Sequence, residues 1–232
     1  MVFSAVNPLE MVIFDNDGVL IDSEKLAARS NAELLTSLGY PTTAEDCEAR
    51  FTGISDRAMQ QELLDQGYTL PKDFIQQMYA VSEHAFETEL EPIYGVRAVI
   101  ENLISRRVKV AVASNAPRVN VLKNLRTTGY DDLLTPDLCF SGLDVPNPKP
   151  APDLHQHILA HFEQSPETAL VIEDSPAGAK GACAAGVRFI GVLYALGDHM
   201  KARRIEEFRD LGALAILESP EELGKTLDSY IS

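Results

Sequence analysis

The stretch "VIFDNDGVLIDSE", residues 12–24, runs from apolar side chains into two aspartates, Asp15 and Asp17. Its apolar, β-branched start is typical of a buried strand. Two carboxylates this close repel each other, at a cost of about 4 kcal/mol for unit charges ~4 Å apart in an effective dielectric of ~20. They therefore require a cation, a shared proton or solvation, and the rest of the chain must decide between these.

Composition and charge narrow the possible partners. The chain has 232 residues, of which 45% are hydrophobic, enough for one large domain or a core with a modest insertion. Its formal net charge of -15 argues against nucleic acid or an anionic membrane surface as partner, because polyanions gain nothing from an acidic surface. The start, "MVFSAVNPLE", lacks the basic and apolar segments of an export signal, and no run of about eighteen apolar residues follows. We therefore expect neither export nor a membrane span.

The cysteines Cys47, Cys139 and Cys183 are widely spaced and form no CxxC pair. This pattern indicates neither a disulfide framework nor a cysteine zinc site, and it fits a reducing compartment. We expect a cytoplasmic protein, and a monomer.

Strand-like and helix-like segments alternate along most of the chain. Short apolar runs typical of buried strands lie at 11–15, 108–114, 138–141, 169–174 and 187–194. Helical patterns separate them from about residue 92 onward, whereas 25–90 contains only helical patterns with capping signals. The pattern predicts an α/β fold: a Rossmann-like parallel sheet core with helices on both faces, residues 1–24 and 91–232, and an inserted α-helical cap domain, residues 25–90.

Polar residues end the predicted strands, where open α/β sheets bind ligands. Each has a purely structural alternative. Asp17-Gly18 is typical of a hairpin turn, Ser114 could cap a helix, and "NPKPAPD" (147–153) could be a stiff linker. A calcium-binding loop is excluded because Leu20 stands where that loop needs glycine.

Taken together, these residues form a set suited to phosphoryl transfer. Asp15 can attack phosphorus, and with Asp174 it offers the oxygen ligands that Mg²⁺ prefers. Lys149 adds a fixed positive charge, and the Ser114 hydroxyl can donate to phosphate oxygens. Asp17 is placed to give a proton to the leaving oxygen and later to take one from water. One carboxylate attacks and its neighbour moves protons, which explains the pair in the opening stretch.

Four motifs, D-x-D-G-V-L-x-D-S-E, S-N, K-P-x-P-D and E-D-S-x-x-G, together resemble those of the haloacid dehalogenase superfamily. The resemblance covers nearly the whole chain, and the position of the helical insertion is similar to that in phosphatases with a small α-helical cap. It implies these roles: Asp15 as nucleophile, Asp17 as acid/base whose carbonyl also binds magnesium, Ser114 and Asn115 as phosphate binders, Lys149 as charge clamp, and Glu173 and Asp174 as metal-site acids.

The resemblance is greatest to sugar-phosphate phosphatases, including those that hydrolyse 6-phosphogluconate. We therefore expect a Mg²⁺-dependent phosphatase that hydrolyses a small phosphorylated metabolite, a sugar phosphate, through an aspartyl-phosphate. Alternatives are a sugar-phosphate mutase, a dehalogenase that needs no magnesium, and a phospho-receiver or binding module without turnover. The related β-phosphoglucomutase carries a histidine where this chain has Ala27, which disfavours the mutase. Asn16 departs from the apolar or small residue usual in the family, and if buried it needs a hydrogen-bond partner.

The segment "EARFTGISDRAM", residues 48–59, places Gly53 between Arg50 and Arg57 at a break between predicted helices. Isolated arginines are most often solvated surface charges. An acidic enzyme that admits an anion nevertheless benefits from positive charge at its entrance, and arginine binds carboxylate or phosphate well. In the family that the chain resembles, the inward loop of the cap contacts the leaving group. We therefore predict that these three residues contact substrate.

Overall fold

The computed structural model describes residues 8–52 and 54–231, so Gly53, one of the predicted substrate contacts, lies outside the described residues. The described chain contains a six-stranded sheet in the order β3-β2-β1-β4-β5-β6, and all its pairings are parallel. The strands are β1 (Met11–Phe14), β2 (Lys109–Ser114), β3 (Cys139–Ser141), β4 (Ala169–Glu173), β5 (Arg188–Val192) and β6 (Ile216–Leu217). This confirms the predicted α/β class with a Rossmann-like parallel sheet.

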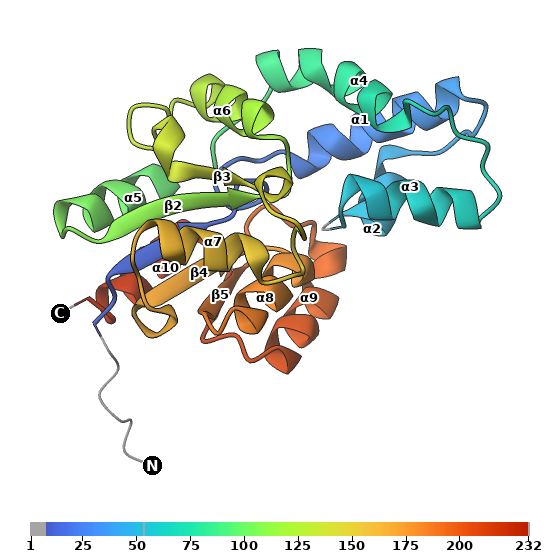
Figure 1. Cartoon of the computed structure of the whole chain (residues 1–232). Coiled ribbons are helices and arrows are strands. Elements are labelled where there is room, and N and C mark those ends of the chain that lie inside the picture. Colours follow the sequence, from blue (N-terminus) through green and yellow to red (C-terminus); the bar gives the residue numbers. More distant parts are fainter. Residues whose placement is uncertain (1–7, 53, 232) are drawn as a thin grey trace.

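Helices cover both faces of the sheet (Figure 1). Side chains alternate along β1, so Val12 and Phe14 pack on one face while Met11 and Ile13 pack on the other. The first face is covered by α5 (Val96–Ser105), α6 (Arg118–Thr127) and α10 (Pro220–Asp228), and the second by α7 (Asp153–His161), α8 (Pro176–Ala184) and α9 (Asp198–Asp210). Short 3-10 turns η1 (Pro136–Leu138), η2 (Gly142–Asp144) and η3 (Pro166–Thr168) lie in the connections. Burial on both sides explains why the central strands are continuous apolar runs.

The order of the strands reverses between β1 and β4. β1 pairs with β2 on one side and with β4 on the other, although β4 comes much later in the chain. At such a reversal, the connections leave to opposite faces and open a crevice beyond the carboxyl ends of the two strands. The topology therefore places Asp15, after β1, and Glu173-Asp174, at the end of β4, beside the position where ligands bind in open sheets.

Between β1 and α5, the described residues form four helices, which we call the helical insertion: α1 (Glu24–Ser37), α2 (Ala44–Phe51), α3 (Asp56–Asp65) and α4 (Phe74–Thr88). They have an apolar cluster of their own, built around Leu35, Phe51, Leu63 and Phe74. Figure 1 shows the insertion beyond the carboxyl ends of the strands. Its treatment as a cap domain with bounds at 25 and 90 stays a prediction.

Two chain segments connect the helical insertion to the sheet, and they run side by side. Ile21 forms an isolated antiparallel bridge with Pro92, the Asp22 N–H donates to the Glu91 carbonyl (3.0 Å), and the Ile93 N–H donates to the Leu20 carbonyl (2.8 Å).

Within the described ranges, no helix has the length and apolar character needed to cross a membrane.

Candidate active site

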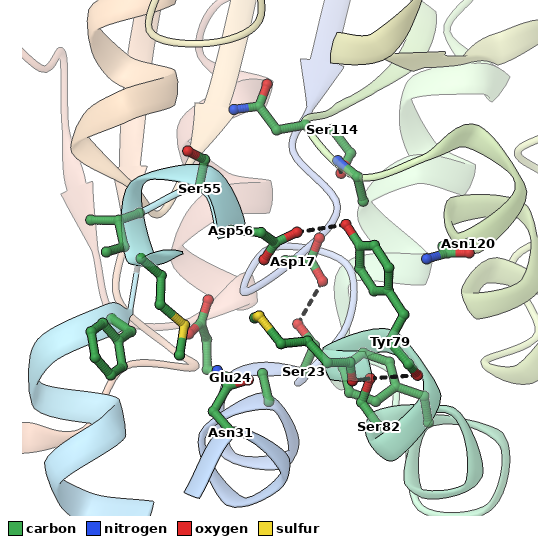
Figure 2. A pocket seen from close by; sticks show the side chains of 18 of the residues that line it. Asp17, Ser23, Glu24, Asn31, Ser55, Asp56, Tyr79, Ser82, Ser114 and Asn120 are labelled. Carbon is green, nitrogen blue, oxygen red and sulfur yellow. Dashed lines mark hydrogen bonds between the residues drawn. The ribbon is translucent and has the colours of Figure 1, made fainter. Parts of the chain in front are cut away.

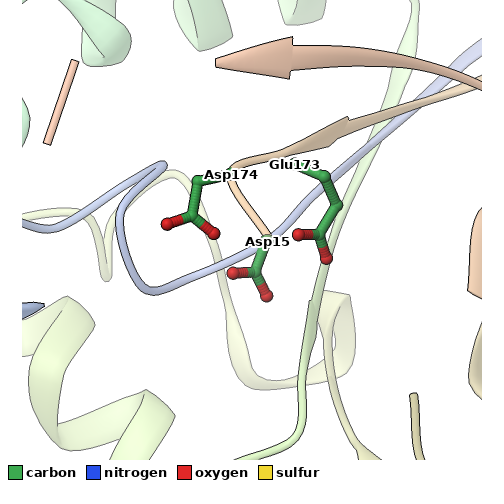
Figure 3. Close-up of side chains that lie close together, drawn as sticks. All are labelled: Asp15, Glu173 and Asp174. Carbon is green, nitrogen blue, oxygen red and sulfur yellow. The ribbon is translucent and has the colours of Figure 1, made fainter. Parts of the chain in front are cut away.

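Three buried carboxylates meet at the carboxyl ends of β1 and β4. Oxygens of Asp15, Glu173 and Asp174 lie within 4.8 Å of one another, and Figure 3 shows the three side chains converging. The sheet fixes their backbones, since the Asp15 N–H donates to the Ile172 carbonyl of β4 (2.9 Å). The sheet thus brings three of the predicted site residues together, and we call them the acidic cluster.

Lys149 is the cation of this cluster. Its Nζ lies 2.7 Å from Asp15 Oδ1 and 2.6 Å from Glu173 Oε1, in a position where only 5% of the residue is exposed. Burial alone would lower the pKa of Lys149, but the two carboxylates outweigh burial and raise it. Glu173 is held further by Ser175, whose N–H and Oγ donate to Oε2 at 3.1 and 2.9 Å. Lys149 therefore remains charged beside Asp15.

One lysine does not balance three buried carboxylates. Burial and the charge of Glu173 raise the pKa of Asp15, and burial with the charges of Glu24 and Asp15 raises the pKa of Asp174. Gly18, at a φ of 70°, leaves room for this arrangement, because a Cβ there would overlap the Asp174 carboxylate. Hard oxygen ligands with uncompensated negative charge fit a divalent cation such as Mg²⁺ or Ca²⁺. The acidic cluster can therefore hold a divalent metal ion.

Asp17 has different neighbours from Asp15. Its Oδ1 accepts a hydrogen bond from Ser23 Oγ (2.7 Å) and its Oδ2 accepts one from Asn16 Nδ2 (3.2 Å). Asn16 is fully buried and therefore needs hydrogen-bond partners, and the Asp17 carboxylate is the partner of its amide nitrogen. Within the described part of the chain, Asn16 Oδ1 has no hydrogen-bond partner. Both oxygens of Asp17 are therefore oriented by neutral donors, away from the Lys149 ion pairs.

Ser114 ends β2 and Asn115 follows it, and both line the same cavity as Asp15. Ser114 Oγ accepts a hydrogen bond from the Ala116 N–H (3.1 Å) and still has its own proton to donate. The Asn115 amide binds the backbone of Lys149 twice, donating from Nδ2 to the carbonyl (2.9 Å) and accepting at Oδ1 from the N–H (3.0 Å). Asn115 thus holds the Lys149 loop in place, and its contact with phosphate stays a prediction.

A cavity of about 630 Å³ lies between the acidic cluster and the helical insertion. Its far wall carries polar side chains from three helices of the insertion, and Figure 2 shows Glu24, Asp56 and Tyr79 around it. The Tyr79 hydroxyl donates to Asp56 Oδ2 at 2.5 Å. Burial and the charge of Asp17 raise the pKa of Glu24 to about 7. The cavity therefore joins the predicted strand-end residues to side chains that the sequence alone did not single out.

The structure does not bring Arg50 or Arg57 to this cavity, and neither is among its lining side chains. Arg50 ends α2 facing α3, where its Nη2 lies 2.7 Å from Gln66 Oε1 and 3.4 Å from Glu62 Oε1. Arg57 is exposed in the first turn of α3. Arg50 is taken up by these contacts of the insertion with itself, and the contact of either arginine with substrate stays a prediction.

Several side chains of the site escaped prediction. Arg204 of α9 is buried and donates to the backbone carbonyl of Asp174, yet its segment reads as an ordinary charged helix. Asp56 and Tyr79 come from separate helices, and only tertiary packing brings them together. Ser23 could have been found, because it follows Asp17 by six residues within the first motif.

Comparisons with known proteins agree with this geometry. The family model described as haloacid dehalogenase-like hydrolase matches residues 12–192. A phosphorylated carbohydrates phosphatase of Thermotoga maritima is 32% identical over 96% of this chain and 100% of its own length. A 6-phosphogluconate phosphatase of Escherichia coli is 29% identical over 77% of this chain and 80% of its own. The crystal structure of a haloacid dehalogenase-like protein of unknown function from Agrobacterium tumefaciens superposes with a TM-score of 0.79, at 28% identity over 95% of this chain and 98% of that one. The chain is thus an enzyme that belongs to the haloacid dehalogenase-like hydrolase family.

Proposed function

We propose that the chain is a Mg²⁺-dependent phosphatase that hydrolyses a monophosphate ester of a small carbohydrate through an aspartyl-phosphate on Asp15. The observation that carries the proposal is the contact of Asp15 with Lys149 inside the acidic cluster, at one end of a cavity of about 630 Å³. The names of the relatives from Thermotoga maritima and Escherichia coli support a phosphorylated carbohydrate as substrate.

The nucleophile of this proposal is Asp15. Lys149 holds its Oδ1 at 2.7 Å, which orients the carboxylate and offsets part of its repulsion with a phosphate dianion. A magnesium ion held by Asp15 and Asp174, with Glu173 nearby, would supply the remaining positive charge. The carboxylate oxygen then forms a bond to phosphorus while the bond to the ester oxygen breaks.

Asp17 serves both halves of the reaction. In its protonated form it gives a proton to the departing ester oxygen, so that the alcohol leaves neutral. Its carboxylate then takes a proton from the water that attacks the aspartyl-phosphate, which releases inorganic phosphate and restores Asp15. Hydrogen bonds from Ser23 and Asn16 orient Asp17 for these two proton transfers.

Two residues at the carboxyl end of β2 contact the phosphate or hold its surroundings in place. Ser114 lines the cavity and donates its hydroxyl to a phosphate oxygen. Asn115 fixes the Lys149 backbone through its two hydrogen bonds. Ala27 also lines the cavity and has no proton to exchange, which favours transfer to water over the return of the phosphoryl group to sugar in a mutase.

The proposal is tested by phosphate release from p-nitrophenyl phosphate, a small ester that needs few contacts with the helical insertion. We expect steady turnover with Mg²⁺ and none with a chelator. Acid-quenched enzyme should carry phosphate on the peptide that contains Asp15, as mass spectrometry would detect. Asp15→Asn should abolish both signals, because the amide is a poor nucleophile. The exposed Asp131→Asn is the matched control and should behave as the wild type. Turnover in a folded Asp15→Asn variant would contradict the mechanism.

A further inference from the structure

The wall of the cavity that faces the acidic cluster is itself acidic. Glu24, Asp56 and Glu83 line it from α1, α3 and α4. Among the described residues, Lys149 and Lys123 are the basic side chains that line the cavity. A substrate that enters therefore meets negative charge on the side where its organic part must lie.

Lys123 does not neutralise the negative charge of this wall. Its Nζ lies 2.7 Å from Glu83 Oε1 and 2.6 Å from Glu87 Oε1, so two carboxylates already share its charge. Lys149 is likewise committed, since it lies between Asp15 and Glu173. Both lysines thus already form ion pairs with carboxylates of the chain.

Asp56 is the carboxylate of this wall with the most defined geometry. It is half-buried, and the Tyr79 hydroxyl occupies its Oδ2 at 2.5 Å. In the part of the chain that the structure describes, no donor occupies Oδ1. Figure 2 shows Asp56 near Asp17, whose negative charge adds to burial in raising the pKa of Asp56. An acceptor held in this way suits a neutral donor such as a hydroxyl.

The cavity also carries uncharged polar side chains. Asn31, Gln76 and Asn120 line the cavity with amides that both donate and accept. Met59 and Phe86 add apolar surface to the lining of the cavity. A polyhydroxylated carbon chain matches this mixture, because each hydroxyl donates and accepts and the carbons prefer apolar contacts.

From this arrangement we infer that the cavity selects monophosphate esters whose organic part is neutral and hydroxylated, with Asp56 accepting a substrate hydroxyl, and rejects esters with a carboxylate or second phosphate. The inference rests on the proposed phosphatase function and concerns the choice of substrate. A second anion there would meet Asp56 and Glu24, while the basic side chains among the described lining residues, Lys123 and Lys149, already pair with carboxylates. Like charges in contact are strongly unfavourable.

The test uses pairs of esters that differ in one charged group. Glucose 6-phosphate and 6-phosphogluconate share a six-carbon chain and its phosphate, and only the second carries a carboxylate. Fructose 6-phosphate and fructose 1,6-bisphosphate differ by one phosphate. We expect wild-type kcat/KM to favour the neutral member of at least one pair by about tenfold or more. Asp56→Asn should reduce that ratio about tenfold, because the repulsion is removed while the side chain keeps its shape.

Two further variants separate this role from a general effect. Asp65→Asn removes the same charge from the exposed end of the same helix and should leave the ratio at the wild-type value. Tyr79→Phe removes the hydroxyl that shares the charge of Asp56, so the ratio should rise. The Tyr79→Phe variant also provides a test of the inference if a thermal melt shows that Asp56→Asn is unfolded.

p-Nitrophenyl phosphate distinguishes the two possible failures. If the wild type does not hydrolyse it with Mg²⁺, the proposed function itself is wrong. If the wild type hydrolyses it but does not favour the neutral member of either pair, the inference is overturned. An unchanged ratio in folded Asp56→Asn, or a fall in the ratio of Tyr79→Phe, also overturns it.

Discussion

Asp15 and Asp17 are two positions apart, yet their surroundings differ. Asp15 contacts the Lys149 ammonium, whereas Asp17 accepts hydrogen bonds from the neutral Ser23 and Asn16. In the proposed mechanism, the carboxylate beside the fixed cation attacks phosphorus and the one held by neutral donors moves protons. The two neighbouring carboxylates of residues 12–24 thus lie in separate environments, which reduces the cost of their mutual repulsion.

Replacing Lys149 should lower stability as well as activity. Lys149→Ala leaves Asp15 and Glu173 buried without their cation, and breaking a buried pair in this way costs about 3–5 kcal/mol. Chemical denaturation should show that loss, and adding Glu173→Gln should recover part of it by removing one unpaired charge. The exposed Lys180→Ala is the control. A Lys149→Ala variant as stable as the control would mean that the ion pairs contribute nothing to folding.

At the scale of elements, α8 approaches β4 so closely that Gly178 has no room for a side chain. A Cβ at Gly178 would overlap the Glu173 carboxylate. We expect Gly178→Ala to destabilise the fold by about 1–3 kcal/mol, as overpacking does, although alanine is the better helix former. Gly224→Ala in α10 is the matched control, because its Cβ would meet Val99 at an ordinary 3.5 Å. That variant should gain up to about 1 kcal/mol in denaturant melts. A change of the same sign in the unfolding free energy of both variants would contradict the packing argument.

On α7, His155 is fully buried and, among the described residues, neither ring nitrogen has a hydrogen-bond partner. Burial, with the charge of Lys149, lowers the pKa of His155 from 6.5 to about 3. The unfolded chain therefore binds a proton below pH 6.5 that the folded protein does not. The stability that His155 allows is complete above that pH and is lost as the pH falls toward 3.

This linkage gives a measurable slope. Between pH 6.5 and pH 5, His155 should cost about 2 kcal/mol of unfolding free energy, since each pH unit in that window is worth about 1.4 kcal/mol. His155→Leu should show a shallower loss of stability on acidification than the wild type. The control is His157→Leu, at an exposed histidine of the same helix, which should keep the wild-type slope. Parallel slopes for all three proteins would refute the assignment.

Five strands of the described sheet could be predicted from the sequence, whereas the short edge strand β6 and the wall of the cavity opposite the sheet could not. Buried parallel strands are continuous apolar runs, and their carboxyl ends share one edge, so the order of strands and polar residues along the chain is enough to group Asp15, Lys149 and Asp174. In the helical insertion, the side that faces the cavity depends on how four amphipathic helices pack. Arg50 fitted the expected chemistry but packs against α3, while Asp56 gave no sequence signal and lines the cavity.

The whole molecule carries a formal net charge of -15, which repels an anionic substrate. Salt screens such long-range repulsion. We therefore expect kcat/KM for a phosphate ester to rise about threefold as ionic strength increases from ~0.01 to ~0.15 M at constant free Mg²⁺. Thermal melts at each salt concentration control for changes in stability. A fall in kcat/KM would show that the local field of Lys149 governs the approach of substrate.

The side-by-side connections between sheet and helical insertion determine how the two parts can move. The chain leaves near Ile21 and returns near Pro92, and these two residues pair directly. A group of helices attached through two adjoining segments can rotate about them in a hinge motion, but the two attachments restrict translation. If the helical insertion turns in this way, the wall that bears Asp56 moves as a unit relative to Asp15, and a single angle sets both the access of water and the contact with a bound ligand.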